Sequence, residues 1–515
     1  MPASSITKSA IKPLTIIHTS DWHLGRRLYG HMRYDEFEAF LSWLQDTISA
    51  QQVDVLIVAG DIFDTMTPSN KAQALYYEFL GKVSKLCCQH IIIVAGNHDS
   101  PTFLDAPSNV LKFLNVHVIG TACEDLNDEV LVLEDSNSEP LCVIAAVPYL
   151  RDRDVRGSSA GESADSKDAN VIAGIRAHYG EVASIAKVEQ RQLSETHQRH
   201  IPIIATGHLF AAGSQTTEDD GVRDLYVGNL GKISAEMFDE CFDYVALGHL
   251  HVPQRVGGCE HIRYSGSPIA MGFGEARQQK QVLLIQFGIE LDKVTNDNIV
   301  SKVIDKVIDL SNEQIVAPAE KTVKKVINKS NALMDDLFGF DEADDIADSE
   351  SADKKLDTNH EEESCVSLTS FKTLHVNDTN RMQVISLPIP CFQKLAQVSG
   401  DLQSITATIK AMTQSESIWL EVIYNGDEIV SELREQVQAM VEGLAFEVLK
   451  IKNTRTYNKV LNQEQTSEAL QDLNELEVFE RCLTTHEIAE TQRESLRDAY
   501  QQILHSIYHE DSRAE

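Results

Sequence analysis

The chain has 515 residues, which is too long for one ordinary hydrophobic core, and its apolar content of 42% is sufficient for two or three domains. It contains no uninterrupted apolar run of about 18 residues, which excludes a membrane-spanning helix. With 79 acidic and 45 basic side chains the formal net charge is −34, so the chain lacks the basic composition typical of an autonomous nucleic-acid-binding protein.

The nine cysteines are scattered along the chain and include no C-x-x-C pair. An odd, dispersed set of this kind is typical of free thiols in a reducing compartment rather than of disulfides or a zinc site. The first thirteen residues also lack the apolar segment of a signal peptide. We therefore expect a cytoplasmic protein that is not associated with a membrane.

The first part of the chain contains seven short apolar runs, most of them followed by Gly, Asp, Asn or His. Continuous apolar runs of this length predict strands that are buried on both faces. Polar stretches such as 34–50 and 71–89 separate several of them and are compatible with helices. This alternation indicates a layered α/β fold, which we assign to residues 1–289 with 281–287 as its last strand. The runs begin at Leu14, Val53, His90, Val116, Leu141, Ile201 and Asp243.

The pattern decays beyond this first domain. Residues 290–376 include the segment 335–363, which has thirteen acidic side chains against two lysines. Such a composition cannot bury enough apolar surface to offset its ordering entropy, so we predict a largely disordered insertion. Apolar runs return in residues 377–460, where strands are expected from Trp419 and Phe446 with a helix between them. This region indicates a small second α/β domain.

Residues 461–515 are predicted to form two further helices. In the second, apolar side chains recur at helical spacing and must be buried against something. The sequence leaves open whether this stripe docks on a partner protein or packs against its own domain. The stripe consists of Leu496, Tyr500, Ile503, Leu504 and Ile507.

Five short polar motifs occur in order along the first domain, each after a predicted strand. Any one of them could be a turn or a strand-end cap. All five together, at the carboxyl ends of strands, favour a functional site. Residues two apart at a strand end point to the same side, so a pair such as Asp21 and His23 can reach into one cavity. The motifs are Asp21-Trp22-His23, Gly60-Asp61-Ile62-Phe63-Asp64, Gly96-Asn97-His98-Asp99, Gly207-His208 and Gly248-His249-Leu250-His251.

The order of these motifs resembles the calcineurin-like metallophosphoesterase superfamily and, within it, the SbcD nucleases. The similarity covers nearly the whole chain except its opening residues and roughly 290–376, where the acidic insertion departs from the family's compact second domain. It implies a layered metallophosphoesterase domain, a small α/β capping domain and C-terminal helices. The segments that carry it are TSDWHLG from Thr19, GDIFD from Gly60, GNHDS from Gly96, GHL from Gly207, GHLHVPQ from Gly248, YSGSPIAMGFGE from Tyr264, SLPIPCF from Ser386 and VFERCL from Val478.

The resemblance implies a centre of two divalent metal ions, with manganese as the family's metal. Asp61 would bridge the two ions, a role that suits a carboxylate because each of its oxygens can face one cation. Mixed imidazole, carboxylate and amide ligation is too rich in nitrogen for magnesium and suits manganese, iron or zinc. One ion would be held by Asp21, His23, Asp61 and His251, and the other by Asp61, Asn97, His208 and His249.

Other residues near these motifs are candidates for supporting roles. The resemblance implies that His98 contacts the phosphate or protonates the leaving oxygen, and simple packing is the alternative. Asp64 either orients a ligand or caps a strand end. Three arginines, Arg26, Arg27 and Arg33, either grip DNA phosphates or belong to the solvated surface.

The resemblance implies a nuclease of DNA repair, replication and recombination. Its activities would be 3′–5′ exonuclease on double strands and endonuclease on single strands and hairpins. The chain has no G-x-x-x-x-G-K-[ST] motif, so we expect it to bind no nucleotide itself. The resemblance implies instead a coiled-coil ATPase partner, SbcC, and a dimer of nuclease subunits within a heterotetramer.

Two other functions are compatible with parts of the pattern. One is a calcineurin-like phosphodiesterase or phosphatase that acts on a small phosphoester or a phosphoprotein, which would not explain the similarity of the later segments. The other is a binding protein with an inactive centre. That function would require a missing metal ligand, and none is missing.

Overall fold

The computed structural model describes residues 13–155, 164–211, 234–288, 372–375, 381–413, 416–426, 430 and 432–454, and the single residues 479, 493, 497 and 500. The disorder predicted between 290 and 371 lies outside the described residues, and so do the predicted tail helices apart from these four positions. Among the four, the rings of Phe479 and Tyr500 stack with their centroids 4.0 Å apart. Within the described residues, no helix is both long and apolar enough to cross a membrane.

The first sheet contains, among the described residues, seven strands in the order β14-β15-β13-β1-β4-β5-β6. The strands β1, β4, β5 and β6 run parallel, whereas β13 pairs antiparallel with both β1 and β15, and β14 pairs antiparallel with β15. The strands are β1 (Leu14–Thr19), β4 (Val55–Ala59), β5 (His90–Val94), β6 (Val116–Ile119), β13 (Gln281–Phe287), β14 (Lys372–His375) and β15 (Arg381–Pro388).

The second sheet contains six strands in the described part of the chain, in the order β11-β12-β10-β9-β8-β7. Its central strands β8, β9, β10 and β12 run parallel. The strands are β7 (Val130–Glu134), β8 (Pro140–Ala145), β9 (Ile203–His208), β10 (Tyr244–Gly248), β11 (Gln254–Arg255) and β12 (Ile262–Tyr264).

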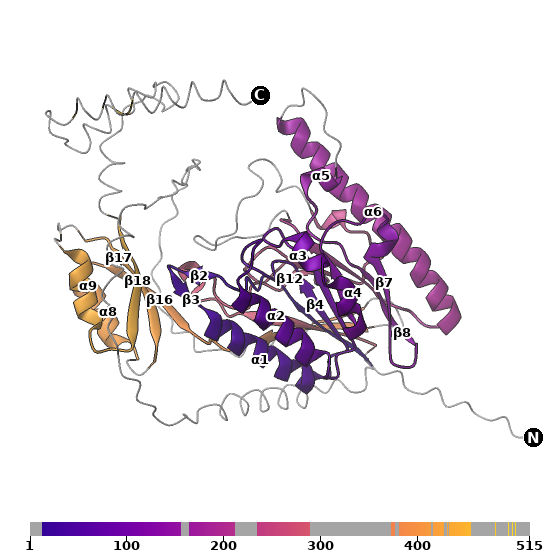
Figure 1. Cartoon of the computed structure of the whole chain (residues 1–515), viewed down its shortest axis with the longest axis horizontal. Helices are drawn as coiled ribbons and strands as arrows, with labels where there is room; N and C mark the ends of the chain where they lie inside the picture. The colour runs from indigo at the N-terminus through magenta and orange to yellow at the C-terminus, as the bar shows by residue number, and fades with distance from the viewer. Residues whose placement is uncertain are drawn as a thin grey trace, which may run out of the picture.

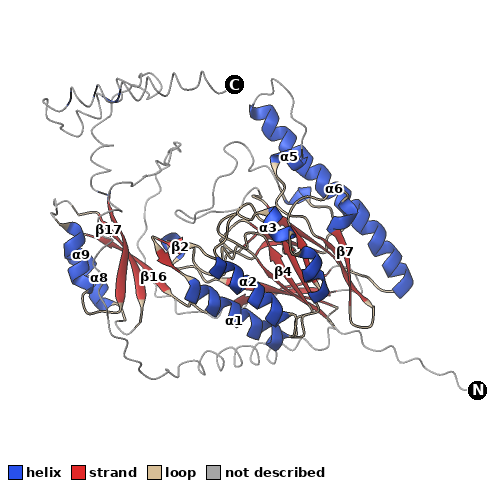
Figure 2. Cartoon of the chain, viewed as in Figure 1, coloured by secondary structure: helices blue, strands red, loops and turns tan. Residues whose placement is uncertain are grey.

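The two sheets share an apolar layer, and helices cover their outer faces (Figures 1 and 2). Successive strand residues point to opposite faces, so Ile16 and Ile57 lie in the layer between the sheets while Ile17 and Leu56 pack toward α1 and α2. On the second sheet, α6 contributes buried side chains such as Tyr179 to the outer core. The layered α/β fold predicted from the sequence is confirmed.

The helices of the first domain follow from apolar stripes and caps. In α2, for example, Leu75, Phe79 and Val83 are buried at helical spacing, and Ser69 caps the first turn by accepting a hydrogen bond from the amide of Ala72. The helices and short 3₁₀ turns are α1 (Tyr34–Gln51), α2 (Asn70–Val83), α3 (Pro101–Asp105), α4 (Ser108–Leu111), η1 (Lys112–Leu114), η2 (Leu126–Glu129), α5 (Asp152–Val155), α6 (Ala164–His197), η3 (Ala235–Met237) and η4 (Phe273–Glu275). A small hairpin is formed by β2 (Arg27–Leu28) and β3 (His31–Met32).

The border of the first domain differs from the sequence prediction. The strand β15 pairs along its whole length with β13, from Gln281 opposite Pro388 to Phe287 opposite Met382. It therefore belongs to the first sheet, although the sequence pattern assigns it to the second domain and makes β13 the end of the first. The buried side chains of Met382, Val384 and Leu387 complete the cores on both faces of that sheet. The strand β14 also lies inside the segment predicted to be disordered.

The second unit is a three-stranded parallel sheet of the order β16-β17-β18, with α8 and α9 packed on one face. Its other face contacts the first domain, where Leu395 packs against Leu28 and Phe273. The ammonium group of Lys450 lies 4.4 Å from the ring centroid of Tyr29. The elements are β16 (Lys394–Gly400), α8 (Leu402–Ala411), β17 (Ile418–Tyr424), α9 (Leu433–Val441) and β18 (Phe446–Asn453).

Candidate metal centre

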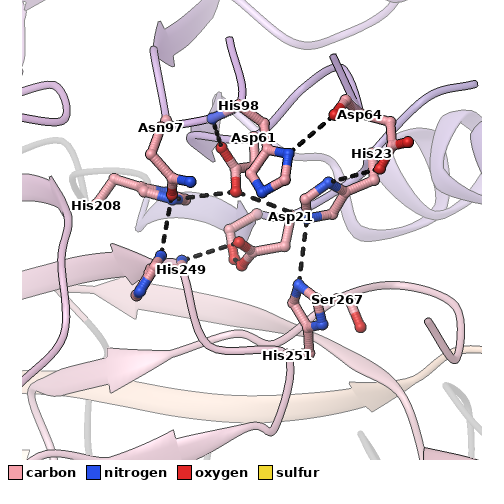
Figure 3. A network of polar contacts seen from close by, with 12 residues as sticks. Asp21, His23, Asp61, Asp64, Asn97, His98, His208, His249, His251 and Ser267 are labelled. Carbon is pink, nitrogen blue, oxygen red and sulfur yellow. Dashed lines mark hydrogen bonds and ion pairs between the residues drawn. The ribbon is translucent and has the colours of Figure 1, made fainter. Parts of the chain in front are cut away.

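The loops that carry the five motifs meet where parallel strands of both sheets end. The strands β1, β4 and β5 lead to Asp21, Asp61 and Asn97, and β9 and β10 lead to His208 and His249. Main-chain hydrogen bonds tie two of the loops together, from the Asp21 amide to the Gly60 carbonyl and from the His23 amide to the Asp61 carbonyl, both 3.0 Å long. In Figure 3 the side chains point toward one another from these loops.

The first group of possible ligands is Asp21, His23 and His251, whose ligand atoms lie within 4.8 Å of one another. The Nε2 atoms of His23 and His251 face each other at 3.2 Å. Both rings are buried, and burial lowers the pKa of His23 to about 4, against the opposing influence of Asp64 and Asp61. A neutral His23 directs a nitrogen lone pair into this space, which suits a cation.

The second group is Asp61, His208 and His249, with Asn97 beside it. The Asn97 side-chain oxygen lies 3.0 Å from His208 Nε2 and 3.1 Å from His249 Nδ1. Asp61 stands between the two groups, because its Oδ2 is 3.2 Å from His208 Nε2 and 3.6 Å from His23 Nε2. The structure thus brings all seven predicted ligands into one buried centre with Asp61 in the middle.

Buried charge in the centre is balanced by the histidines. Burial would raise the pKa of Asp61, but His208 and His23 hold it well below its ordinary value. Burial likewise opposes a charge on His208, yet Asp61 and Asp21 raise the pKa of His208 to about 9. The carboxylates therefore attract positive charge into the centre, which divalent cations can supply. Carboxylate, imidazole and amide donors converging in this way fit two metal ions.

The backbone is strained where it presents these side chains. Asp21, His23 and Asp61 have φ angles of 53°, 46° and 50°, and His249 has a φ of 102°. Non-glycine residues seldom occupy this region, and such strain is typical of functional sites. Close packing adds a further constraint, because a Cβ atom on Gly248 would lie 1.9 Å from the Ala59 carbonyl oxygen.

Contacts behind the possible ligands fix their orientation. The Ala59 carbonyl oxygen lies 3.0 Å from His208 Nδ1, and Asp64 Oδ1 lies 3.5 Å from His23 Nδ1. Asp64 is therefore placed to orient His23, as one of its two predicted roles requires. The guanidinium of Arg26 lies 3.3 Å from the same carboxylate.

His98 lies at the rim of the centre, with its ring edge-on to His23 at a centroid distance of 4.9 Å. Its Nδ1 is 2.9 Å from the Asp64 carbonyl oxygen and so donates a hydrogen bond to it. This leaves Nε2 to exchange a proton. The His98 amide also donates to Asp61 Oδ1 at 2.9 Å, which links the loop to the central carboxylate.

Two carboxylates near the centre were not singled out from the sequence. Asp99 is fully buried and accepts hydrogen bonds from the amides of Ile62, Phe63 and Gly96. Glu275 is equally buried and lies behind His251. Asp99 belongs to the segment GNHDS and Glu275 to the segment YSGSPIAMGFGE, so the available signal was their place in those segments.

The three arginines have different environments. Arg33 was predicted as a possible DNA contact, and this is wrong. Its buried guanidinium forms a two-pronged ion pair with Glu36 and donates to the Ala270 carbonyl, so it holds the start of α1. Arg26 is partly buried, and Arg27 is exposed on β2.

Comparisons with known proteins agree with this geometry. Residues 14–253 match the calcineurin-like phosphoesterase family, and residues 391–487 match the type 5 capsule protein repressor C-terminal domain. The chain is 30% identical over 498 residues to the SbcD subunit of the nuclease SbcCD from Escherichia coli K12, covering 96% of this chain and 98% of that protein. Its counterparts in Rhodobacter capsulatus and Bacillus subtilis are 36% and 32% identical over 53% of this chain, which spans 66% of each of them.

Proposed function

The chain belongs to the SbcD family of metal-dependent nucleases, and we propose that it hydrolyses phosphodiester bonds of DNA at a centre of two manganese ions. The observation that carries this proposal is the position of Asp61. Its carboxylate stands between two groups of nitrogen and oxygen donors, at the point where strands of both sheets end. Two cations held about 3.5–4 Å apart need such an anion between them.

The ligand sets follow the two groups of donors. Asp21, His23 and His251 would hold one ion, and Asn97, His208 and His249 the other, with Asp61 shared. The amide and carboxylate oxygens together with imidazole nitrogens favour manganese over magnesium, which prefers oxygen ligands throughout.

The chain's own residues prepare the reaction around these ions. When bound, the ions supply Lewis acidity toward the phosphodiester and lower the pKa of a water molecule. His98 keeps its Nδ1 proton on the Asp64 carbonyl, so proton exchange takes place at Nε2. From there His98 donates a proton to the leaving oxygen. Arg26 and Arg27 stand on the segment that follows His23, where they are candidates for phosphate contacts.

An exposed apolar surface on α4 and η1 supports self-association. Val110, Phe113 and Leu114 have exposed fractions of 68%, 90% and 42%. We propose that this surface binds a second copy of the chain, because apolar side chains so exposed on one short segment mark an interface. Phe113→Ser should shift the chain toward a monomer in analytical ultracentrifugation. Val188→Ser, which changes another exposed apolar residue on α6, should leave the oligomeric state unchanged.

Partner docking is assigned to the tail helices predicted from the sequence. A chain that ends at Thr466 should remain folded, retain its metals and cut simple DNA ends weakly. It should no longer co-purify with the coiled-coil ATPase or respond to ATP. An insoluble truncated chain would show instead that the stripe covers its own domain, and a truncated chain that still binds the ATPase would refute docking.

The decisive test of the function uses the purified chain with manganese, with and without the ATPase partner. Linear duplex DNA, a DNA hairpin and a small phosphodiester such as bis(p-nitrophenyl) phosphate serve as substrates, and Asp61→Asn is the control. We expect metal-dependent cleavage of both DNAs that the control lacks, with 3′–5′ polarity on the duplex. Hydrolysis of the small ester without cleavage of either DNA under any condition would favour the alternative phosphodiesterase.

A further inference from the structure

A buried ion pair lies directly behind His251. Glu275 is the last residue of η4, is fully buried and places its Oε1 3.2 Å from His251 Nδ1. Its partner Lys280, 6% exposed, donates to the other carboxylate oxygen. That oxygen also accepts hydrogen bonds from the Met271 amide at 3.0 Å and from the Ser267 hydroxyl at 3.4 Å.

The same pair holds both the side chain and the backbone of His251. While Glu275 accepts from the imidazole, the ammonium of Lys280 donates to the His251 carbonyl at 3.2 Å and to the Ser267 hydroxyl at 3.0 Å. The Ser267 amide donates to the same carbonyl at 3.2 Å. The orientation of His251 is thus fixed from two sides, and its Nε2 is directed at His23 across the centre.

Stability alone is a weak reason for this arrangement. Removing two charges from water costs much of what their attraction returns, and apolar pairs of similar volume are often as stable. Burial would raise the pKa of Glu275, but Lys280 and the hydrogen bond from His251 lower it to about 2, so the carboxylate is ionised. An ionised carboxylate behind an imidazole fixes its tautomer and makes its other nitrogen a better metal ligand.

We propose that Glu275, held in place by Lys280, is a positioning residue that makes His251 a strong metal ligand. It accepts the Nδ1 proton of His251 and thereby keeps the lone pair of Nε2 directed into the centre. His208, in contrast, is backed by the neutral carbonyl of Ala59. The inference rests on the proposed role of His251 as a ligand, and it adds a residue that determines how tightly one of the two ions binds.

The test is a calorimetric titration of the metal-free full-length chain with manganese chloride. Glu275→Gln alone would leave Lys280 buried without its counter-ion, so the first variant combines Glu275→Gln with Lys280→Met. The second variant, Glu275→Asp, retains the ion pair but withdraws the carboxylate from His251. Glu129→Gln is the matched control, because Glu129 is also fully buried and bonds a histidine, His178, at 2.8 Å away from the centre.

The wild-type chain and the Glu129→Gln control should each bind two ions per chain with the same affinities. In both Glu275 variants one of the two ions should bind about 10–100-fold more weakly. A folded Glu275 variant, with circular dichroism like that of the wild type, that binds both ions at wild-type affinity overturns the proposal. The titration needs no cleavage, so a chain that binds two ions but leaves DNA intact would refute the nuclease function without touching this inference.

Discussion

Replacing Asp99 by asparagine tests how the centre is built. The Asp99 carboxylate accepts three backbone hydrogen bonds, from Ile62 at 3.1 Å, Phe63 at 3.0 Å and Gly96 at 2.9 Å, and so joins two of the loops that carry possible ligands. An asparagine oxygen can satisfy Ile62 and Gly96, but its amide group then faces the Phe63 amide. One unsatisfied buried donor and two weakened bonds cost about 2–4 kcal/mol. Burial and Asp61 raise the pKa of Asp99 to about 6, so loss of its charge relieves some repulsion.

We therefore expect a destabilisation near the lower end, about 2 kcal/mol, and weaker binding of both metal ions. Urea unfolding followed by the fluorescence of Trp22 and Trp43, which both pack in the first domain, measures it. The control is Asp105→Asn, which keeps its single bond from the Gly120 amide and should change stability by less than about 1 kcal/mol. An unchanged unfolding midpoint for Asp99→Asn would refute the reasoning.

Three further predictions concern the centre itself. Asp61→Asn preserves shape but removes the charge between the two ions, so metal content by mass spectrometry and DNA cleavage should both collapse; wild-type values of both would contradict the assignment. His98→Ala should keep both ions while cleavage falls about 10²–10⁴-fold, and loss of one ion would make His98 a ligand. Gly248→Ala places a Cβ 1.9 Å from the Ala59 carbonyl and 2.8 Å from His208 Nδ1, so metal binding and thermal stability should both fall. Unchanged melting temperature and metal content for that variant would disprove the tight packing.

The centre was predictable because its chemistry is concentrated at strand ends. Buried parallel strands leave a clear apolar signal, and Asp21, Asp61 and Asn97 follow such runs directly. Their convergence follows from the parallel order of the strands. That the ligand groups share Asp61 came from the resemblance, and its position between them is visible only in three dimensions.

The features that escaped prediction depend on contacts between distant segments. The strand β15 reads as an apolar run of the second domain, but β13 offers it a free edge in the first sheet. Arg33 resembles a surface cation in sequence, yet Glu36 one turn further along α1 neutralises it in a buried pair. Glu275 lies 24 positions from His251, and no local pattern signals that the two side chains meet.

The central claim is that Asp61 bridges two metal ions, and anomalous diffraction from manganese-soaked crystals tests it most directly. We predict two anomalous peaks about 3.5–4 Å apart, one beside Asp21, His23 and His251 and the other beside His208, with the Asp61 carboxylate between them. A single peak, or two peaks that do not share Asp61, would contradict the account.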